Sequence, residues 1–241
     1  MKSQDKTREI MESYGSHPKV TAVMDVDRAQ SVSRGKAKTL TSMLNKAKLN
    51  RPGNWVLLCA ADMLYTEQSI QQIRAAVQDV DMLEFTIPLF YFGIDFKHYL
   101  HIKGGAPLLF KITENMRICP TEKPILADGT WYSKSGYVKT ILTDCPGFHY
   151  TWLKPRSRIV QRLRMYSQQR GKAEYFMDWF NEIYLKWDDA KAEELYRKAK
   201  EITGHGGFHY WREEKLEIFK GEHPREVASH PYSSIDVRTI E

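Results

Sequence analysis

The chain has 241 residues, of which 42% are hydrophobic and 27% are charged, and its formal net charge is +6. This length suits one large domain or one domain with an appended helical part, and the composition is that of an ordinary globular protein. No apolar run approaches the ~20 residues of a membrane-spanning helix, and the polar N-terminus is unlike a secretory signal. The positive charge favours an anionic ligand, a nucleic acid or an acidic surface, and does not choose among them.

The cysteines indicate the compartment. Cys59, Cys119 and Cys145 are an odd and sparse set, and two of them fall inside predicted strands. A disulfide framework uses more cysteines in even number, so we expect reduced thiols and a cytoplasmic location.

The first elements in chain order are a helix, a strand and a second helix. Ser3 and Asp5 are N-cap candidates for a helix that ends near Gly15, and residues 20–24 are a short β-rich run. Residues 25–34 form a polar loop, and Leu40, Met43, Leu44 and Ala47 then recur at the spacing of a helix core face. Arg34, Lys36 and Lys38 stand at the start of that helix, where cations oppose the helix dipole. Either they are solvated or an anion binds beside them, and we favour the anion because the loop follows a strand.

An apolar run of strand length, residues 54–61, ends abruptly at Asp62. Thr66 caps a helix predicted over residues 66–78, and an apolar run over 82–92 follows. This alternation predicts an α/β fold with a mostly parallel sheet and crossover helices. Ligands bind at the carboxyl ends of parallel strands, so Asp62 is a candidate site residue. The alternative is that Asp62 only begins a turn.

The pattern changes after Gly93. We expect a polar, aromatic loop over residues 95–101, a strand over 108–112, a turn at Asp128-Gly129-Thr130, and a short strand or loop over 145–152. From Pro155 the chain is predicted to be helical, and its polar C-terminal tail, residues 224–241, is predicted to be partly loose. The predicted domains are therefore residues 1–153 and a C-terminal helical part with its tail, residues 154–241.

Two patterns mark the C-terminal part. One is a basic run without an acidic residue, which is either a solvated helix face or a contact for the phosphates of an acceptor. The other is an aromatic stripe at helical spacing, which we expect to pack in the core. The basic run is Lys154, Arg156, Arg158, Arg162, Arg164, Arg170 and Lys172, and the stripe is Phe176, Trp179, Phe180, Ile183 and Trp187.

The order of these signals resembles the family 2 glycosyltransferases of the GT-A fold, over roughly residues 1–170. Residues 3–7 are similar to the S-x-D-x-T element of that family, and residues 34–38 to its basic element at the next crossover. Residues 55–63 resemble the strand that ends in the D-x-D motif. His149-Tyr150-x-Trp152, followed by a basic helix, is similar to the C-terminal part of bacterial and phage members.

The resemblance implies a nucleotide-sugar donor and a divalent metal, Mg²⁺ or Mn²⁺, that neutralises the donor diphosphate. Asp62 and His149 are the candidate metal ligands. Asp128 is the candidate catalytic base, with Glu122 as the alternative, and a simple Asp-Gly turn is the other interpretation of Asp128. The donor-binding candidates are Ser3, Asp5, Asp27, Arg34, Lys36 and Asp62.

The sequence departs from the family pattern in three places. Ala60 replaces the first D-x-D carboxylate, Met63 replaces a following acidic residue, and the family's first strand would precede Ser3. Two hypotheses follow: a metal-assisted glycosyltransferase whose given sequence is shortened, or a degenerate member that serves as a binding or assembly module. A nucleic-acid-binding protein without enzymatic activity is a third, supported only by charge.

The candidate partners are the nucleotide sugar and an acceptor, which is a glycan, a protein or a modified base in DNA. A second copy of the chain is a further candidate, because the C-terminal helices or another subunit must cover the sheet edge where the absent strand would pair.

Overall fold

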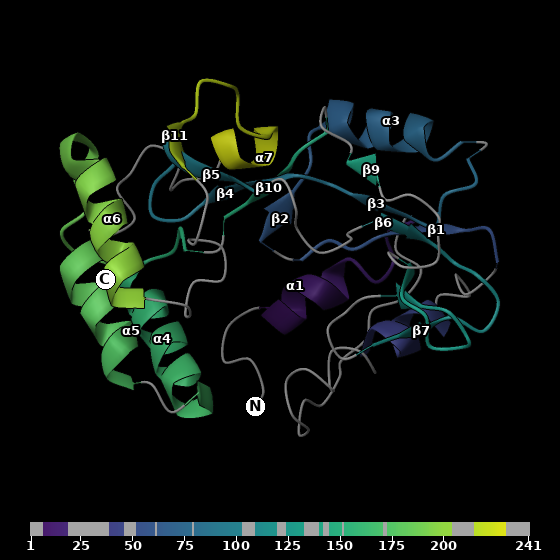
Figure 1. Cartoon of the computed structure of the whole chain (residues 1–241), viewed down its shortest axis with the longest axis horizontal. Helices are drawn as coiled ribbons and strands as arrows, with labels where there is room; N and C mark the ends of the chain where they lie inside the picture. The colour runs from purple at the N-terminus through teal and green to yellow at the C-terminus, as the bar shows by residue number, and fades with distance from the viewer. Residues whose placement is uncertain are drawn as a thin grey trace. The chain divides into compact units, whose positions relative to one another are not determined.

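In the computed structural model the chain (Figure 1) divides into two compact units, each made of several stretches of the sequence. Unit 1 comprises Met1–Leu58, Asp79–Thr86 and Ala106–Thr140, and unit 2 comprises Cys59–Gln78, Ile87–Gly105 and Ile141–Glu241. The predicted division at residue 153 stays a prediction. The structure describes residues 7–18, 39–45, 52–60, 62–78, 80–102, 109–119, 124–132, 140–141, 145–150, 152–170, 173–203 and 215–229.

Unit 1 is built on a four-stranded sheet in the order β1-β6-β3-β9. Its strands are β1 (Trp55–Leu57), β6 (Leu109–Lys111), β3 (Glu84–Thr86) and β9 (Thr140–Ile141). β6 is antiparallel to both β1 and β3, and the strand predicted over 108–112 is confirmed. The antiparallel strands β7 (Arg117–Ile118) and β8 (Pro124–Ile125) form a separate two-stranded sheet.

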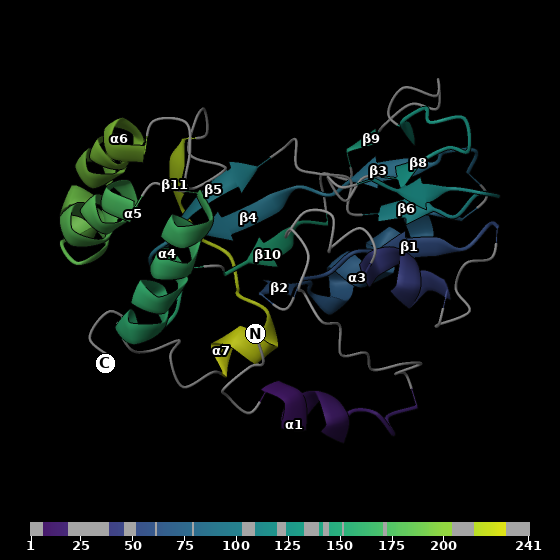
Figure 2. The same ribbon diagram turned by 90° about the horizontal axis from the view of Figure 1, so that it is seen from below.

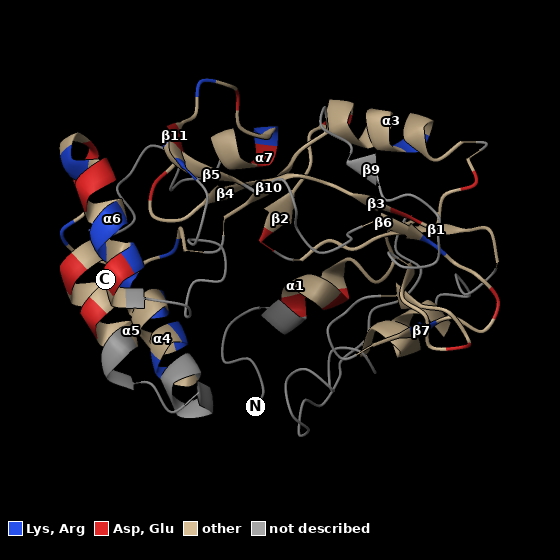
Figure 3. Cartoon of the chain, in the orientation of Figure 1, with Lys and Arg blue, Asp and Glu red and all other residues tan. Residues whose placement is uncertain are grey.

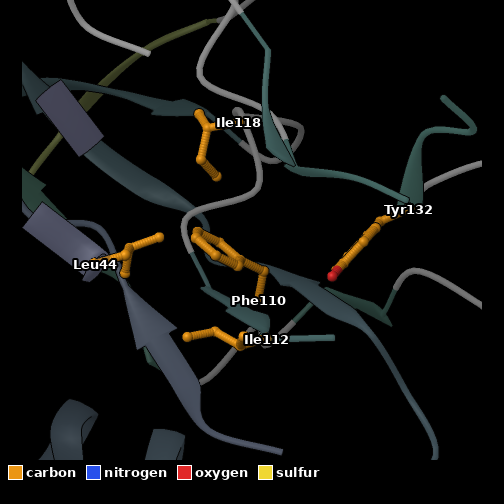
Figure 4. Packing of buried hydrophobic residues seen from close by; sticks show 5 residues of the cluster. All are labelled: Leu44, Phe110, Ile112, Ile118 and Tyr132. Atoms are coloured by element: carbon orange, nitrogen blue, oxygen red, sulfur yellow. The ribbon is translucent and has the colours of Figure 1, made fainter. Parts of the chain in front are cut away.

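The core of unit 1 surrounds the ring of Phe110 on the central strand β6. Figure 4 shows Leu44, Ile112, Ile118 and Tyr132 around this fully buried ring. Leu44 comes from a helix over residues 39–45, so part of the predicted core face is confirmed. Met43 was expected on that face but is 46% exposed.

The short helix α1 (Thr7–Ser13) also belongs to unit 1. Ile10 and Tyr14 lie one helical turn apart, and their side chains are 56% and 57% exposed. The amide of Gly15 donates to the carbonyl of Glu12 and ends the helix, as the sequence predicts.

Unit 2 contains a five-stranded sheet in the order β11-β5-β4-β10-β2, whose central strands lie side by side in Figure 2. β4 is antiparallel to β5 and parallel to β10, while β11 and β2 add antiparallel edges. The strands are β2 (Met63–Leu64), β4 (Leu89–Phe92), β5 (His98–Ile102), β10 (Gly147–His149) and β11 (Leu216–Ile218).

The fold is α/β, but the expectation of a mostly parallel sheet is wrong for the described strands. Among the pairs whose register is described, only β4 and β10 run parallel. A short connection joins β4 to β5, whereas parallel neighbours need a crossover of about a dozen residues. The segment 95–101, expected to be a loop, therefore holds most of β5. The apolar run 82–92 divides at Pro88, which cannot donate to a ladder, and its halves enter different sheets.

The helices of unit 2 follow the sequence pattern more closely. Thr66 caps α3 (Glu67–Ala76), because its hydroxyl oxygen accepts from the Ser69 amide over 3.0 Å. α4 (Arg156–Arg170), α5 (Ala173–Trp179) and α6 (Ala192–Thr203) pack side by side in Figures 1 and 2. None of the helices in the described ranges is both long enough and apolar enough to cross a membrane.

The aromatic stripe is core, as predicted. Its side chains are between 0% and 6% exposed. A π-helical turn, η2 (Phe180–Tyr184), follows α5, and a 3₁₀ turn, η3 (Asp189–Lys191), leads into α6. In this segment Trp179 and Tyr184 are both fully buried.

Residues 215–229, which we call the C-terminal strap, supply an edge strand of the sheet in unit 2. The strap adds β11 and the short helix α7 (Arg225–Ala228), so the beginning of the tail expected to be loose is folded. His223 packs against Phe92, Phe96 and Phe219. The carbonyl of Phe96 lies 2.9 Å from Nε2 of His223 and can only accept, so Nε2 carries the hydrogen. Nδ1 then accepts from the Tyr150 hydroxyl over 2.9 Å.

We predict that His223 makes the stability of unit 2 depend on pH. Burial lowers the pKa of His223 below 6.5, so on acidification the unfolded chain takes up this proton before the folded chain does. Stability from this residue is complete above pH 6.5 and declines as the pH falls, by at most about 1.4 kcal/mol per pH unit. His223→Gln keeps a donor and an acceptor but cannot titrate. The free energy of unfolding, measured by denaturant titration, should fall more steeply from pH 7 to pH 5 for the natural chain than for His223→Gln. Parallel curves of this free energy against pH would contradict the prediction.

Candidate functional site

Asp62 is placed by the pairing of two short strands. β2 lies antiparallel to β10, with Met63 opposite His149. The amide of Tyr150 donates to the carbonyl of Asp62 over 2.8 Å and extends the pairing by one residue. The backbone therefore holds Asp62 beside the end of β10.

The side chains converge on the carboxylate of Asp62. His149 Nε2 lies 3.2 Å from Asp62 Oδ1, and Arg162 Nη1 from α4 lies 3.9 Å from Oδ2. The three side chains are between 11% and 24% exposed, so they are shielded but reachable from solvent. The ring of Tyr91 packs edge-on against the His149 ring at 5.1 Å and supports it.

A second cation, Lys154, belongs to the same group. Burial and the charge of Arg162 lower the pKa of Lys154, while the charge of Asp62 opposes this shift. The guanidinium of Arg162 lies 4.8 Å from the ring centre of Trp152, whose side chain is buried. We call Asp62, His149, Lys154 and Arg162 the Asp62 cluster. It holds two basic side chains, Lys154 and Arg162, and one carboxylate, a surplus of basic groups that favours an anionic ligand.

The pKa of Asp62 reflects these neighbours. Burial alone would raise it, but the hydrogen bond with His149 and the charges of His149, Lys154 and Arg162 hold it well below 3.8. Asp62 is therefore ionised at neutral pH. A carboxylate in this state is a weak proton acceptor, but it is a ligand for metal ions.

Cys59 and Ala60, in the turn that precedes Asp62, border the Asp62 cluster. Cys59 is exposed, and its thiol donates to the carbonyl of Met63 over 3.2 Å. Burial of the sulfur and the charge of Asp62 raise the pKa of this thiol. Ala60, at the first position of the D-x-D-like motif, accepts from the Met63 amide through its carbonyl. The turn is thus closed by backbone contacts that do not need a carboxylate at position 60.

An octahedral metal ion would replace the hydrogen that now joins Asp62 and His149 Nε2, and it fits their spacing. Mg²⁺ binds its ligands at about 2.1 Å, so two neighbouring ligands are about 3 Å apart. The Asp62 oxygen and the His149 nitrogen are 3.2 Å apart, and both atom types bind divalent metals. Ions of this kind keep several positions for water and substrate phosphates, so two protein ligands suffice.

The predicted catalytic residue Asp128 lies in unit 1, on the turn after β8. It is exposed, and its Oδ1 accepts from the Thr130 amide over 2.8 Å, while Gly129 has a φ of 90°. The hydrogen bonds from Thr130 lower the pKa of Asp128, which weakens it as a proton acceptor. The Asp-Gly turn interpretation is therefore correct for its backbone, and its catalytic role stays a prediction.

Several predicted residues lie outside the described residues. They are Ser3, Asp5, Asp27, Arg34, Lys36 and Glu122. Their roles stay predictions. Lys154 and Arg162 were not predicted to join Asp62, because the whole basic run was interpreted as either a solvated helix face or a contact for acceptor phosphates. No spacing in the sequence signals this, because the contact depends on tertiary packing.

A second group contains metal-ligand atoms. Among the described residues, Asp95, His98 and Asp189 bring one ligand atom each within 4.8 Å of one another. The carboxylate of Asp95 already accepts from the amides of Lys97 and His98, from His98 Nδ1 and from Trp187 Nε1. Asp189 is paired with Lys97. We therefore interpret this group as a hydrogen-bonded network that ties the β4–β5 hairpin to the segment after α5.

Comparison of the chain with protein-family models, with curated proteins and with solved structures finds no match. The resemblance to family 2 glycosyltransferases rests on the motifs in the sequence.

We predict that replacing Asp62 changes the reactivity of Cys59. The charge of Asp62 raises the pKa of Cys59, so Asp62→Asn should lower it and increase the thiolate fraction at neutral pH. The rate of alkylation by iodoacetamide, followed by mass spectrometry of the Cys59 peptide, should increase. Cys119 is the internal reference and should not change. An equal rate at Cys59 in both proteins would mean that the two side chains are not close.

Proposed function

We propose that the chain is a glycosyltransferase that moves a sugar from a nucleotide-diphosphate sugar to an acceptor, assisted by Mg²⁺ or Mn²⁺. The observation that carries this proposal is the Asp62 cluster, in which a carboxylate and an imidazole 3.2 Å apart adjoin two cations. Separation of a nucleoside diphosphate from a sugar needs negative charge to be stabilised on the leaving group. The cluster holds groups that can do this.

Asp62 and His149 would hold the metal ion, which acts as a Lewis acid toward the diphosphate when bound. Lys154 and Arg162 would pair with the remaining phosphate oxygens. The lowered pKa of Lys154 supports this role. Burial and the charge of Arg162 destabilise its ammonium form, and a bound anion would stabilise that form. The buried ring of Trp152 orients Arg162.

The acceptor-side base is assigned to Asp128 by the resemblance alone. The donor contacts of Ser3, Asp5, Asp27, Arg34 and Lys36 belong to the same proposal. So does the cytoplasmic location, which is supported by three cysteines that are all thiols.

The second candidate is a binding module that keeps the anion site without catalysis. Ala60 favours it, because the motif then supplies one carboxylate from its D-x-D positions, that of Asp62. The two candidates share the binding step and differ in turnover.

Calorimetric titration with UDP in the presence of Mn²⁺ tests the shared step. We expect binding that Asp62→Asn and Lys154→Met each weaken by about tenfold or more, which corresponds to about 1.4 kcal/mol. Asp178→Asn, which removes an exposed carboxylate from α5, is the matched control and should bind like the natural chain. Since the donor base is not known, the titration is repeated with GDP, CDP and dTDP. Absence of binding to all four diphosphates would contradict the proposal.

Release of nucleoside diphosphate from the corresponding nucleotide sugars separates the candidates. A transferase should release it with Mn²⁺, and Asp128→Asn should reduce acceptor-dependent release without changing diphosphate affinity. Binding without any release would favour the module.

A further inference from the structure

The excess positive charge of the chain is confined to one segment. Residues 145–173 contain seven Lys and Arg and no Asp or Glu. The whole chain has 36 basic and 30 acidic residues, so outside this segment 29 basic residues face 30 acidic ones. The remainder of the protein is nearly neutral, and the segment accounts for the basic character.

The helix α4 presents three of these charges outward. Ile159 and Leu163 are 0% exposed and face the interior of unit 2, whereas Arg156, Arg158 and Arg164 are exposed. The coloured part of the α4 ribbon in Figure 3 shows blue Lys and Arg positions and no red ones. Arg158 and Arg162 are one turn apart, about 6 Å along the helix axis, so the positive charge continues outward from Asp62 along α4.

We infer that the exposed side of α4 binds the phosphate backbone of a nucleic-acid duplex. This side adjoins the Asp62 cluster, to which Arg162 of α4 belongs. Arginine pairs with phosphate through two parallel hydrogen bonds. Ser157 and Gln161, exposed between the arginines, supply further polar groups of the kind that contact phosphate and sugar.

Two other polyanionic surfaces fit α4 less well. A helix that binds a membrane surface inserts its apolar side into the lipid, but Ile159 and Leu163 are already used in the core. A protein that binds single strands stacks bases on exposed aromatic rings. Among the described side chains of α4, the exposed ones are Arg156, Ser157, Arg158, Gln161, Arg164 and Met165, and none is aromatic.

Binding of a duplex does not depend on the proposed transfer reaction. If both hold, the acceptor is a group on the nucleic acid, and that extension rests on the proposed function. The test below uses no nucleotide sugar, so its failure is distinguishable from failure of the donor site.

The experiment measures the affinity of the full chain for a labelled 20-base-pair DNA duplex by fluorescence anisotropy over a series of salt concentrations. Log affinity should fall linearly with log salt. In the triple variant Arg156→Gln, Arg158→Gln, Arg164→Gln, log affinity should fall less steeply with log salt. The magnitude of the slope should be smaller by about 2.7, since each phosphate contact contributes about 0.9. The control variant Lys191→Gln, Arg197→Gln, Lys220→Gln removes the same charge from exposed positions elsewhere in unit 2 and should leave the slope unchanged.

Three results would overturn the inference. They are no binding of the duplex at low salt, equal loss of slope in both triple variants, and binding to phosphatidylserine vesicles without binding to DNA. Thermal melts by circular dichroism check that the α4 variant is folded. If it is not, the double variant Arg158→Gln, Arg164→Gln replaces it, and its slope should fall by about 1.8.

Discussion

The carboxylate of Asp62 joins parts of unit 2 that are far apart in the sequence. It lies at the start of β2, contacts His149 at the end of β10 and faces Arg162 on α4. Without this negative charge, Arg162 and Lys154 would face each other with no balancing anion among the groups of the cluster. Even with it, one cation is in excess, and burial increases the energetic cost of that excess. The cluster is therefore electrostatically prepared for an anion, and it accepts a metal ion only together with further negative ligands.

The helices of the C-terminal part hold the cations in place. The hydroxyl of Tyr184 donates to the carbonyl of Lys154 over 2.9 Å, and Tyr184 is itself buried in the aromatic stripe. A second contact is made just after β10. His223 of the C-terminal strap accepts a hydrogen bond from the hydroxyl of Tyr150, the residue after His149. Packing remote from the cluster thus fixes the two backbone segments that carry Lys154 and His149. A precise cluster built on short strands needs such support.

The sequence predicted the helices well because their signals are local. The cap at Thr66 and the stripe around Trp179 depend on neighbours within one or two turns. Strand direction is not local, and the alternation of helices and strands favoured parallel pairing. The short connection before His98 and the break at Pro88 produced antiparallel pairs and two sheets. Asp62 and His149 were proposed together from family motifs, and their atoms lie 3.2 Å apart. The link of Lys154 and Arg162 to Asp62 depends on how α4 and the segment before it pack, which no spacing in the sequence encodes.

The most direct test of the Asp62 cluster is pulsed electron paramagnetic resonance of Mn²⁺ bound to the protein with the nucleoside diphosphate that binds best. An imidazole nitrogen on the metal gives a nitrogen modulation in the echo decay. The cluster predicts this modulation in the natural chain, its loss in His149→Gln with Mn²⁺ still bound, and its retention in His98→Gln, which alters the separate Asp95 network. Bound Mn²⁺ with no nitrogen modulation, or with modulation that survives His149→Gln, would contradict the assignment of Asp62 and His149 as a shared metal site.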